Sequence, residues 1–160
     1  MTLEKTDSTN IWPYVGIYIL TTIVLWLIWL AFVSVVPAAE KSGGTAIGVA
    51  TIFGSTLVSY SMFIKRNGRL LDRGEYWKIV IFTTAATLLF SIVSLLFSIA
   101  AGLTPGNLNS IPAGVWIMML VMGALFGFCL NAAGFSNRFG RTLLKANRKR
   151  QTQLDTEPFR

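Results

Sequence analysis

The sequence predicts an all-α fold, an integral membrane four-helix bundle with both termini in the cytoplasm. Hydrophobic residues make up 53% of the 160-residue chain and charged residues only 13%, about half the usual charged share of a soluble protein. The hydrophobic residues also form runs longer than the roughly 18 residues that mark a membrane span. The chain therefore divides into a short cytoplasmic N-terminus at 1–12, a membrane domain at 13–137 and a basic cytoplasmic tail at 138–160.

Three uncharged stretches supply the four predicted spans. The first lies between Asp7 and Glu40, and the second covers 42–64. The third covers 79–137, which is too long for one helix and right for two. Proline, glycine and asparagine between 103 and 112 break it into two parts. In chain order, the predicted spans are about 13–36, 42–64, 79–102 and 113–135.

Basic residues gather on one predicted side of the membrane. Four crossings place the N-terminus, the loop between the second and third spans, and the tail on the same side. Thirteen of the fourteen Lys and Arg residues lie in these segments, and Lys41 alone lies on the other side. Because short cytoplasmic loops carry an excess of Lys and Arg, this bias predicts that the basic side is cytoplasmic.

Hydroxyl-bearing and small residues form stripes along the predicted helices. In the third span they recur at intervals of three and four, which places them on one helical face. That stripe is Thr84, Thr87, Ser91, Ser94 and Ser98. The second span has a stripe of Gly44, Gly48, Thr51, Ser55 and Ser59, which opens with a Gly-xxx-Gly pair. The first span has Tyr18, Thr22, Trp26 and Trp29.

Two interpretations of these stripes stay open. Small and hydroxyl-bearing residues line helix contacts in lipid, where no hydrophobic force drives helices together. Alternatively, the stripes line a groove for a lipid or small molecule. Asn131 is the most informative polar position, because it is the only carboxamide inside a span. Trp26 and Trp29 lie near mid-membrane, where each indole N–H should seek an acceptor on a neighbouring helix.

Several function classes are disfavoured by what the chain lacks. Histidine is absent and Cys129 is the one cysteine, which removes the commonest general base and excludes a disulfide or cysteine metal site within one chain. No charged residue lies inside a predicted span, whereas proton-coupled pumps bury such groups. Small multidrug transporters also have four spans, but they depend on a membrane-embedded glutamate, and this chain has no glutamate in a predicted span. We therefore expect no enzyme activity, no metal and no cofactor.

The loop between the second and third spans holds the candidate functional residues of the basic side. Asp72 and Glu75 have the spacing of a capping box, in which Glu75 reaches back to the start of the third helix. Alternatively, or in addition, Glu75 pairs with Arg66 or Arg69 and fixes a site at the membrane surface. The candidate loop residues are Arg66, Arg69, Asp72, Glu75 and Trp77.

This loop also carries a family resemblance. The quoted positions are Phe63, Lys65, Gly68, Arg69, Leu70, Glu75, Tyr76, Trp77 and Lys78. They resemble a motif in an uncharacterised family of small four-span bacterial inner-membrane proteins. The chain departs from that motif at Leu71 and Asp72, where the pattern has a proline and a polar residue. The resemblance implies a bacterial inner membrane and no particular activity.

The remaining expectations concern partners and function. The basic tail suits a short interfacial helix on anionic lipid headgroups, and nucleic acid is not an expected partner. We predict a non-enzymatic protein of the inner membrane that acts by binding a membrane partner, either another protein or a second copy of itself. The alternative is a carrier or flippase for a lipid or small neutral molecule, which would use the Ser/Thr-lined helix faces.

Overall fold

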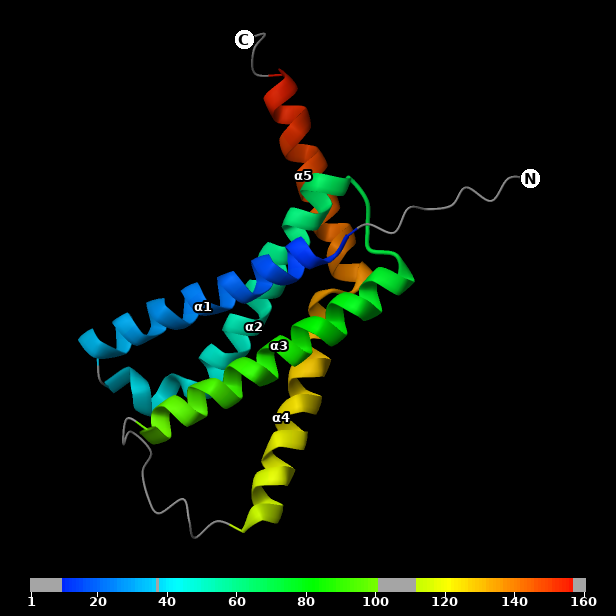
Figure 1. The fold of residues 1–160 in the computed structure, drawn as a ribbon. Coiled ribbons are helices and arrows are strands. Elements are labelled where there is room, and N and C mark those ends of the chain that lie inside the picture. The colour runs from blue at the N-terminus through cyan, green and yellow to red at the C-terminus, as the bar shows by residue number, and fades with distance from the viewer. Residues whose placement is uncertain (1–9, 37, 101–111, 157–160) are drawn as a thin grey trace.

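Helices account for every regular element in the part of the chain that the structure describes, residues 10–36, 38–100 and 112–156 of a computed structural model (Figure 1). The five helices are α1 (Trp12–Val35), α2 (Ala38–Asn67), α3 (Arg73–Ala100), α4 (Ala113–Gly134) and α5 (Asn137–Thr156). Four of them are long and apolar enough to cross a membrane, and α5 is not. The chain is therefore a multi-pass membrane protein, as its hydrophobic runs predict.

The loop between α2 and α3 is shorter than the gap between the predicted second and third spans. Helix α2 continues through Lys65 and Arg66 to Asn67, because basic side chains in a last turn favour the negative end of the helix dipole. Gly68 then ends α2 with a φ of 64°, a left-handed conformation that glycine adopts at helix C-termini. Helix α3 begins at Arg73, directly after Asp72, as the capping-box spacing predicts, and ahead of the predicted span at 79–102. The predicted break at 103–112 lies outside the described residues, apart from Pro112.

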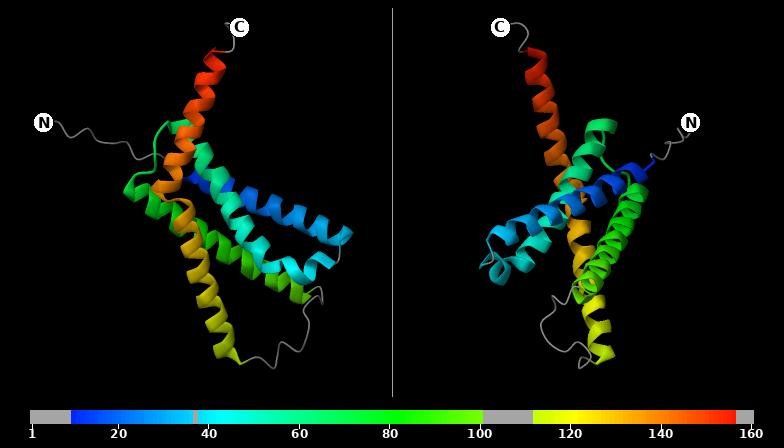
Figure 2. Two further views of the ribbon diagram at one scale, coloured as in Figure 1. Left: turned by 180° about the vertical axis from the view of Figure 1, so that it is seen from behind. Right: turned by 60° about the vertical axis from the view of Figure 1, so that its left-hand side comes forward.

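The helices converge at one end and diverge at the other (Figures 1 and 2). The start of α1, the end of α2, the start of α3 and the end of α4 come together, and we call this the basic end. At the opposite, far end, the start of α4 lies apart from the other three helices (Figure 2). Helix α1 contacts α2 and α3, α4 contacts the same two helices, and α5 contacts α2.

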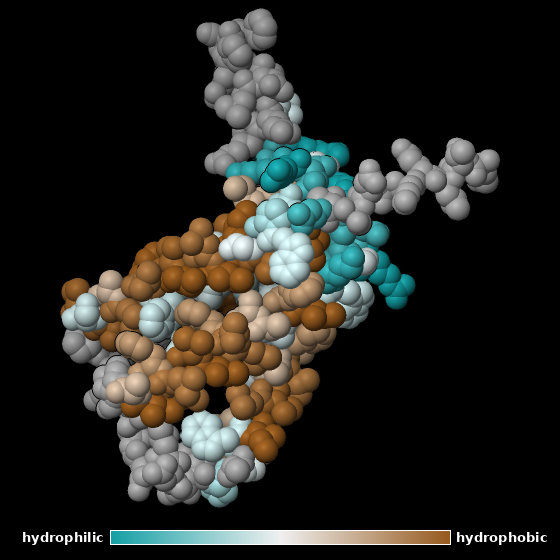
Figure 3. Space-filling view, in the orientation of Figure 1, coloured by the Kyte–Doolittle hydropathy of each residue, from teal (hydrophilic) through white to brown (hydrophobic). Residues whose placement is uncertain are grey.

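The buried core lies at the basic end. Its apolar members are Tyr14, Val15, Tyr18, Tyr60, Phe63, Ile64, Leu71, Ile79, Val80 and Phe135. Large apolar side chains cover the outside of the four spans, as a lipid-facing surface requires. Figure 3 shows hydrophilic residues gathered around the α2–α3 loop and the base of α5, whereas most of the coloured surface over the four spans is hydrophobic, with scattered residues of intermediate hydropathy. The basic end is thus both the packed end and the charged end.

Two glycines set how closely helices approach α2 at the basic end. A β-carbon on Gly134 would collide with the side chain of Thr56, and one on Gly140 would collide with the phenol of Tyr60. Only glycine therefore permits these approaches of α4 and α5 to α2. Gly123 and Gly127, earlier in α4, have no such neighbour within 4 Å, so the close contact of α4 is confined to its last turns.

Candidate functional site

Asn131 lies at the junction of three helices. Its side chain is fully buried, and its amide nitrogen donates to the Thr84 hydroxyl of α3 at 3.4 Å. The Thr56 hydroxyl of α2, which also donates to the Ile52 carbonyl, lies 3.4 Å from the Asn131 carbonyl oxygen. Both bonds are long, so each contributes toward the lower end of the roughly 0.6–2 kcal/mol measured for interhelical bonds in membranes. Asn131 therefore joins α2, α3 and α4.

A second set of hydrogen bonds fastens α1 to the same region. The Ser59 hydroxyl donates to the Tyr14 carbonyl at 2.8 Å, and the Asn67 amide donates to the Tyr14 hydroxyl at 2.7 Å. Thr22 lies within hydrogen-bonding distance of Ser55, at 2.9 Å. In a lipid environment each of these groups needs a protein partner. The basic half of the α1 and α2 stripes thus serves helix packing.

The expected ion pair of Glu75 is present, and its partner is Arg69. The guanidinium donates to both carboxylate oxygens, at 2.6 and 2.8 Å. Glu75 is buried, and it also accepts a bond from the Asp72 backbone amide at 3.0 Å. The bond to Glu75 raises the pKa of the Arg69 guanidinium above its usual value, so the arginine stays charged. Glu75 is therefore both a helix cap and an ion-pair partner.

The other loop candidates have different surroundings. Arg69 also lies over the Phe63 ring, at 5.5 Å. Arg66 is exposed and forms no ion pair among the described residues. Asp72 is exposed, and the reciprocal capping bond from its side chain is absent from the described part of the chain. Trp77 stacks on Phe128 of α4, with ring centroids 6.2 Å apart. Trp77 and Arg69 are thus packing residues, and Arg66 and Asp72 face outward.

The hydroxyl stripe of α3 has two environments along its length. Thr84 is buried beside Asn131. Thr87, Ser91 and Ser94 line a cavity of about 380 Å³ between α1, α2 and α3, which we call the three-helix cavity. Ser98 lies beyond it. Each of the two interpretations therefore fits one part of the stripe: the stripe packs against other helices at the basic end and lines a cavity toward the far end.

The three-helix cavity unites residues from all three predicted stripes. Helix α1 contributes Thr22, Trp26 and Trp29, and α2 contributes Gly48 and Thr51 among others. A smaller cavity of about 190 Å³ lies between α2, α3 and α4, and the two share Ile52, Thr87 and Ser91. Gly48, for which the sequence left packing and groove lining open, faces open space. The cavities exist because the helices diverge where these small residues lie.

The cavity wall offers hydrogen-bond acceptors and donors without charge. The hydroxyls of Thr87 and Ser91 donate to carbonyls one turn earlier in α3, each at 2.9 Å. The Thr87 oxygen also lies 2.8 Å from the Tyr18 hydroxyl, whereas the Ser91 oxygen keeps its lone pairs as acceptors. The expected acceptors for the Trp26 and Trp29 indoles are absent among the described residues, and the Trp26 ring packs edge-on against Phe90 at 5.7 Å. None of the lining residues is ionisable. The wall therefore suits an uncharged ligand.

Sequence reasoning missed some members of the site. Thr56 lies off the α2 stripe, one position after Ser55, and its role depends on where α4 approaches. Phe90 carries no polar group that would single it out, although it follows Thr87 by one helical turn. Within the described residues no three His, Cys, Asp or Glu side chains gather as metal ligands would.

Comparisons with known proteins add no assignment. No family model matches the chain, and searches of curated proteins and of solved structures find no match.

The Arg69–Glu75 geometry predicts which charge swap restores stability. Glu75→Arg leaves Arg69 facing a like charge, so we expect a lower midpoint of thermal unfolding in detergent. Adding Arg69→Glu should recover part of that loss, because the two charges exchange places. Adding Arg66→Glu, the matched control, should recover nothing. The recovery should be on the order of 1 kcal/mol or less, because Arg69 is partly exposed. Equal recovery by both double variants would contradict a specific pair.

Proposed function

We propose that this chain is a non-enzymatic protein of a bacterial inner membrane that binds an uncharged amphipathic molecule, a lipid or a small neutral compound, in the three-helix cavity. The observation that carries the proposal is the meeting of hydroxyl and tryptophan stripes from α1, α2 and α3 around one space of about 380 Å³. Ligand-binding pockets of small molecules span about 300–1,000 Å³, with mostly apolar walls and a few polar groups. The three-helix cavity has this character.

The polar groups of the wall support selection for a neutral ligand with a hydroxyl or amide. Ser91 offers acceptor lone pairs, and Trp26 and Trp29 offer indole N–H donors. A ligand group that both donates and accepts can use the two sides at once. A charged group would find no counter-ion in the wall and would retain its desolvation cost. A simple alkane would leave the indole donors unpaired.

Packing at the basic end supports binding over continuous passage. Tyr14, Tyr18, Phe63 and Asn131 are buried between the cavity and that end. A carrier or flippase would have to separate these side chains in each cycle, so transport would need a conformation beyond the present one. Transport stays the second candidate function, and the Ser and Thr hydroxyls that line the three-helix cavity favour it. Binding to a membrane-protein partner, or to a second copy, stays a prediction from the sequence.

The orientation that we propose places the basic end in the cytoplasm. Its support is the charge bias, with Lys41 as the single base outside the N-terminus, the α2–α3 loop and the tail with their flanking helix turns. The three-helix cavity then opens in the outer half of the membrane. Its ligand would be drawn from the outer leaflet or from the compartment outside it.

Tryptophan fluorescence tests the binding proposal. With Trp12, Trp77 and Trp116 changed to Phe, only the two cavity tryptophans report. A long-chain alcohol brominated on its chain should quench them saturably in neutral detergent. A brominated alkane and a brominated carboxylate of equal chain length should bind about tenfold more weakly, a difference of about 1.4 kcal/mol. Equal quenching by all three probes would contradict a polar-lined site.

Leucine substitutions on α3 provide the matched control for this measurement. Ser91→Leu and Ser94→Leu fill the cavity, so each should abolish the saturable quenching while the protein still inserts. Ser98→Leu makes the same change one turn beyond the cavity and should leave the quenching intact. If Ser98→Leu is as damaging as the other two, the stripe acts through assembly and the binding proposal is wrong.

Reporter fusions test the proposed orientation separately. Fusions of a cytoplasm-active reporter after Asn67 and after Lys149 should be active, and a fusion between 107 and 109 should be inactive. Inactive fusions after Asn67 would reverse the orientation and move the cavity to the inner half of the membrane.

A further inference from the structure

A second cavity lies at the basic end, between the end of α2 and α5. Its volume is about 480 Å³, and we call it the headgroup pocket. It is lined by Ser61, Ile64 and Lys65 of α2 and by Leu143, Ala146, Asn147 and Lys149 of α5. Tyr60 meets Gly140 just below it, and Leu143 and Leu144 pack against the buried core. The position of α5 beside α2 therefore creates the pocket.

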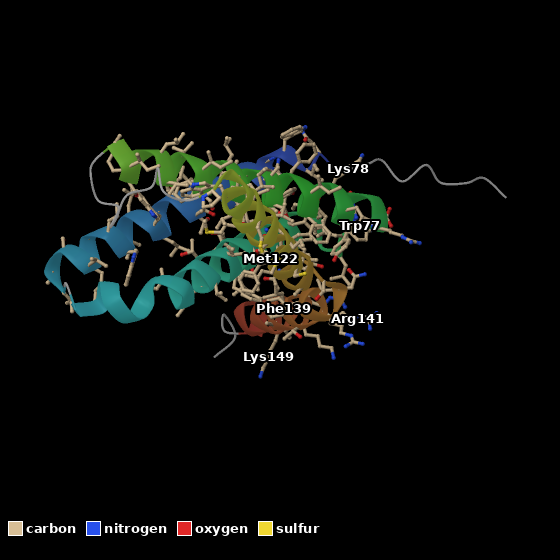
Figure 4. The ribbon with its side chains drawn as sticks, turned by 90° about the horizontal axis from the view of Figure 1, so that it is seen from below. Trp77, Lys78, Met122, Phe139, Arg141 and Lys149 are labelled. Carbon is tan, nitrogen blue, oxygen red and sulfur yellow. The ribbon has the colours of Figure 1, made fainter. Side chains whose placement is uncertain are left out.

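The wall of the headgroup pocket is positively charged above an apolar floor. Lys65 and Lys149 approach it from different helices, and neither is paired with a carboxylate among the described residues. Ser61 and Asn147 add neutral hydrogen-bonding groups. Ile64 is almost fully buried, and Leu143 is half-buried. Figure 4 shows Lys149 on the outer side of α5, away from α1 and α3.

The position of the pocket along α2 favours a lipid over a soluble phosphate compound as its ligand. Lys65 is the first charged residue after the uncharged stretch from Ser42 to Ile64. The pocket therefore lies where a membrane's hydrocarbon ends and its headgroups begin. Two lysines and an amide suit a phosphate, whereas the Ile64 and Leu143 floor suits the first carbons of an acyl chain. A soluble phosphate compound would contact the lysines and the amide but would leave Ile64 and Leu143 uncovered.

A neighbouring cavity at the same end provides the contrast. It is lined by Leu71, Asp72, Arg73, Tyr76, Trp77, Ser136 and Asn137. There an aspartate stands beside the arginine, so the wall has no net preference for an anion. The headgroup pocket has two bases and no acid in its wall. Charge complementarity therefore selects the headgroup pocket.

We propose that the headgroup pocket binds one anionic phospholipid, with its phosphate between Lys65 and Lys149 and the start of its chains on Ile64 and Leu143. This assignment goes beyond the proposed function, because it concerns a different cavity, a charged ligand and the opposite end of the membrane domain. The bound lipid would hold α5 against α2. The basic tail then recognises lipid at a defined site rather than only by its net charge.

Native mass spectrometry of the full chain in a neutral detergent tests the site. Dioleoyl phosphatidylglycerol should bind in preference to dioleoyl phosphatidylcholine, which has the same chains and no net charge. Lys65→Gln and Lys149→Gln should each weaken the phosphatidylglycerol complex about fivefold, since a base near an anionic surface contributes about that factor. Lys145→Gln removes the same charge from α5 outside the pocket and should change binding by less than about twofold.

Conservative variants and a soluble competitor separate a lipid site from misfolding and from binding of phosphate alone. Lys65→Arg and Lys149→Arg keep the charge and should restore binding, which excludes misfolding as the cause of the loss. Glycerol 3-phosphate should fail to displace the lipid, because it lacks the chains. Displacement by glycerol 3-phosphate, equal binding of the two phospholipids, or equal loss in the Lys145→Gln control would each overturn the proposal. Quenching of Trp26 and Trp29 by the brominated alcohol should be unchanged in these variants, so the two sites fail independently.

Discussion

The need of buried polar groups for a protein partner governs this structure. Lipid offers no hydrogen bonds, so a hydroxyl or amide inside the membrane is stabilised when it finds a partner within the protein. Asn131 shows the consequence, because satisfying its amide brings Thr56 of α2 and Thr84 of α3 to the same point. Gly134 allows that approach, since any β-carbon there would collide with Thr56. The junction of α2, α3 and α4 follows from one carboxamide and one glycine.

The rest of the architecture depends on the point along the helices at which hydrogen bonds between helices stop. Thr87 still makes a bond between helices, because its hydroxyl oxygen lies 2.8 Å from the Tyr18 hydroxyl of α1. Farther toward the far end, the hydroxyls of Ser91 and Ser98 donate within their own helix, so they place no demand on a neighbouring helix. Beyond Thr87, without such cross-helix bonds from the Ser91 and Ser98 hydroxyls and with Gly48 and Gly123 facing open space, the helices diverge. Both the packed basic end and the three-helix cavity therefore arise from the same stripes. Satisfied donors also leave the cavity wall with acceptor oxygens, which shapes the ligand that we propose.

The sequence predicted the number of spans and the helical faces well, because span length and helical spacing are local properties. The bounds of α1 and α4 agree with the predicted spans within a residue or so. The pair of Glu75 with a loop arginine was also predictable, since a short loop restricts its partners, but the choice of Arg69 over Arg66 needed the turn at Gly68. The division of each stripe was not predictable. Ser55 and Ser91 belong to similar patterns, and only the angles between helices decide which one packs.

Disulfide formation between paired cysteines tests most directly whether the basic end is packed and the far end open. In a Cys129→Ser background, Thr22→Cys with Ser55→Cys should cross-link rapidly in native membranes, because the two side-chain oxygens lie 2.9 Å apart. Ser91→Cys with Gly123→Cys should not, because both residues line the smaller cavity. A β-carbon at 123 meets no atom within 4 Å, whereas disulfides need β-carbons about 3.5–4.5 Å apart. Equally rapid cross-linking of both pairs would show helices packed along their whole length and would contradict the account.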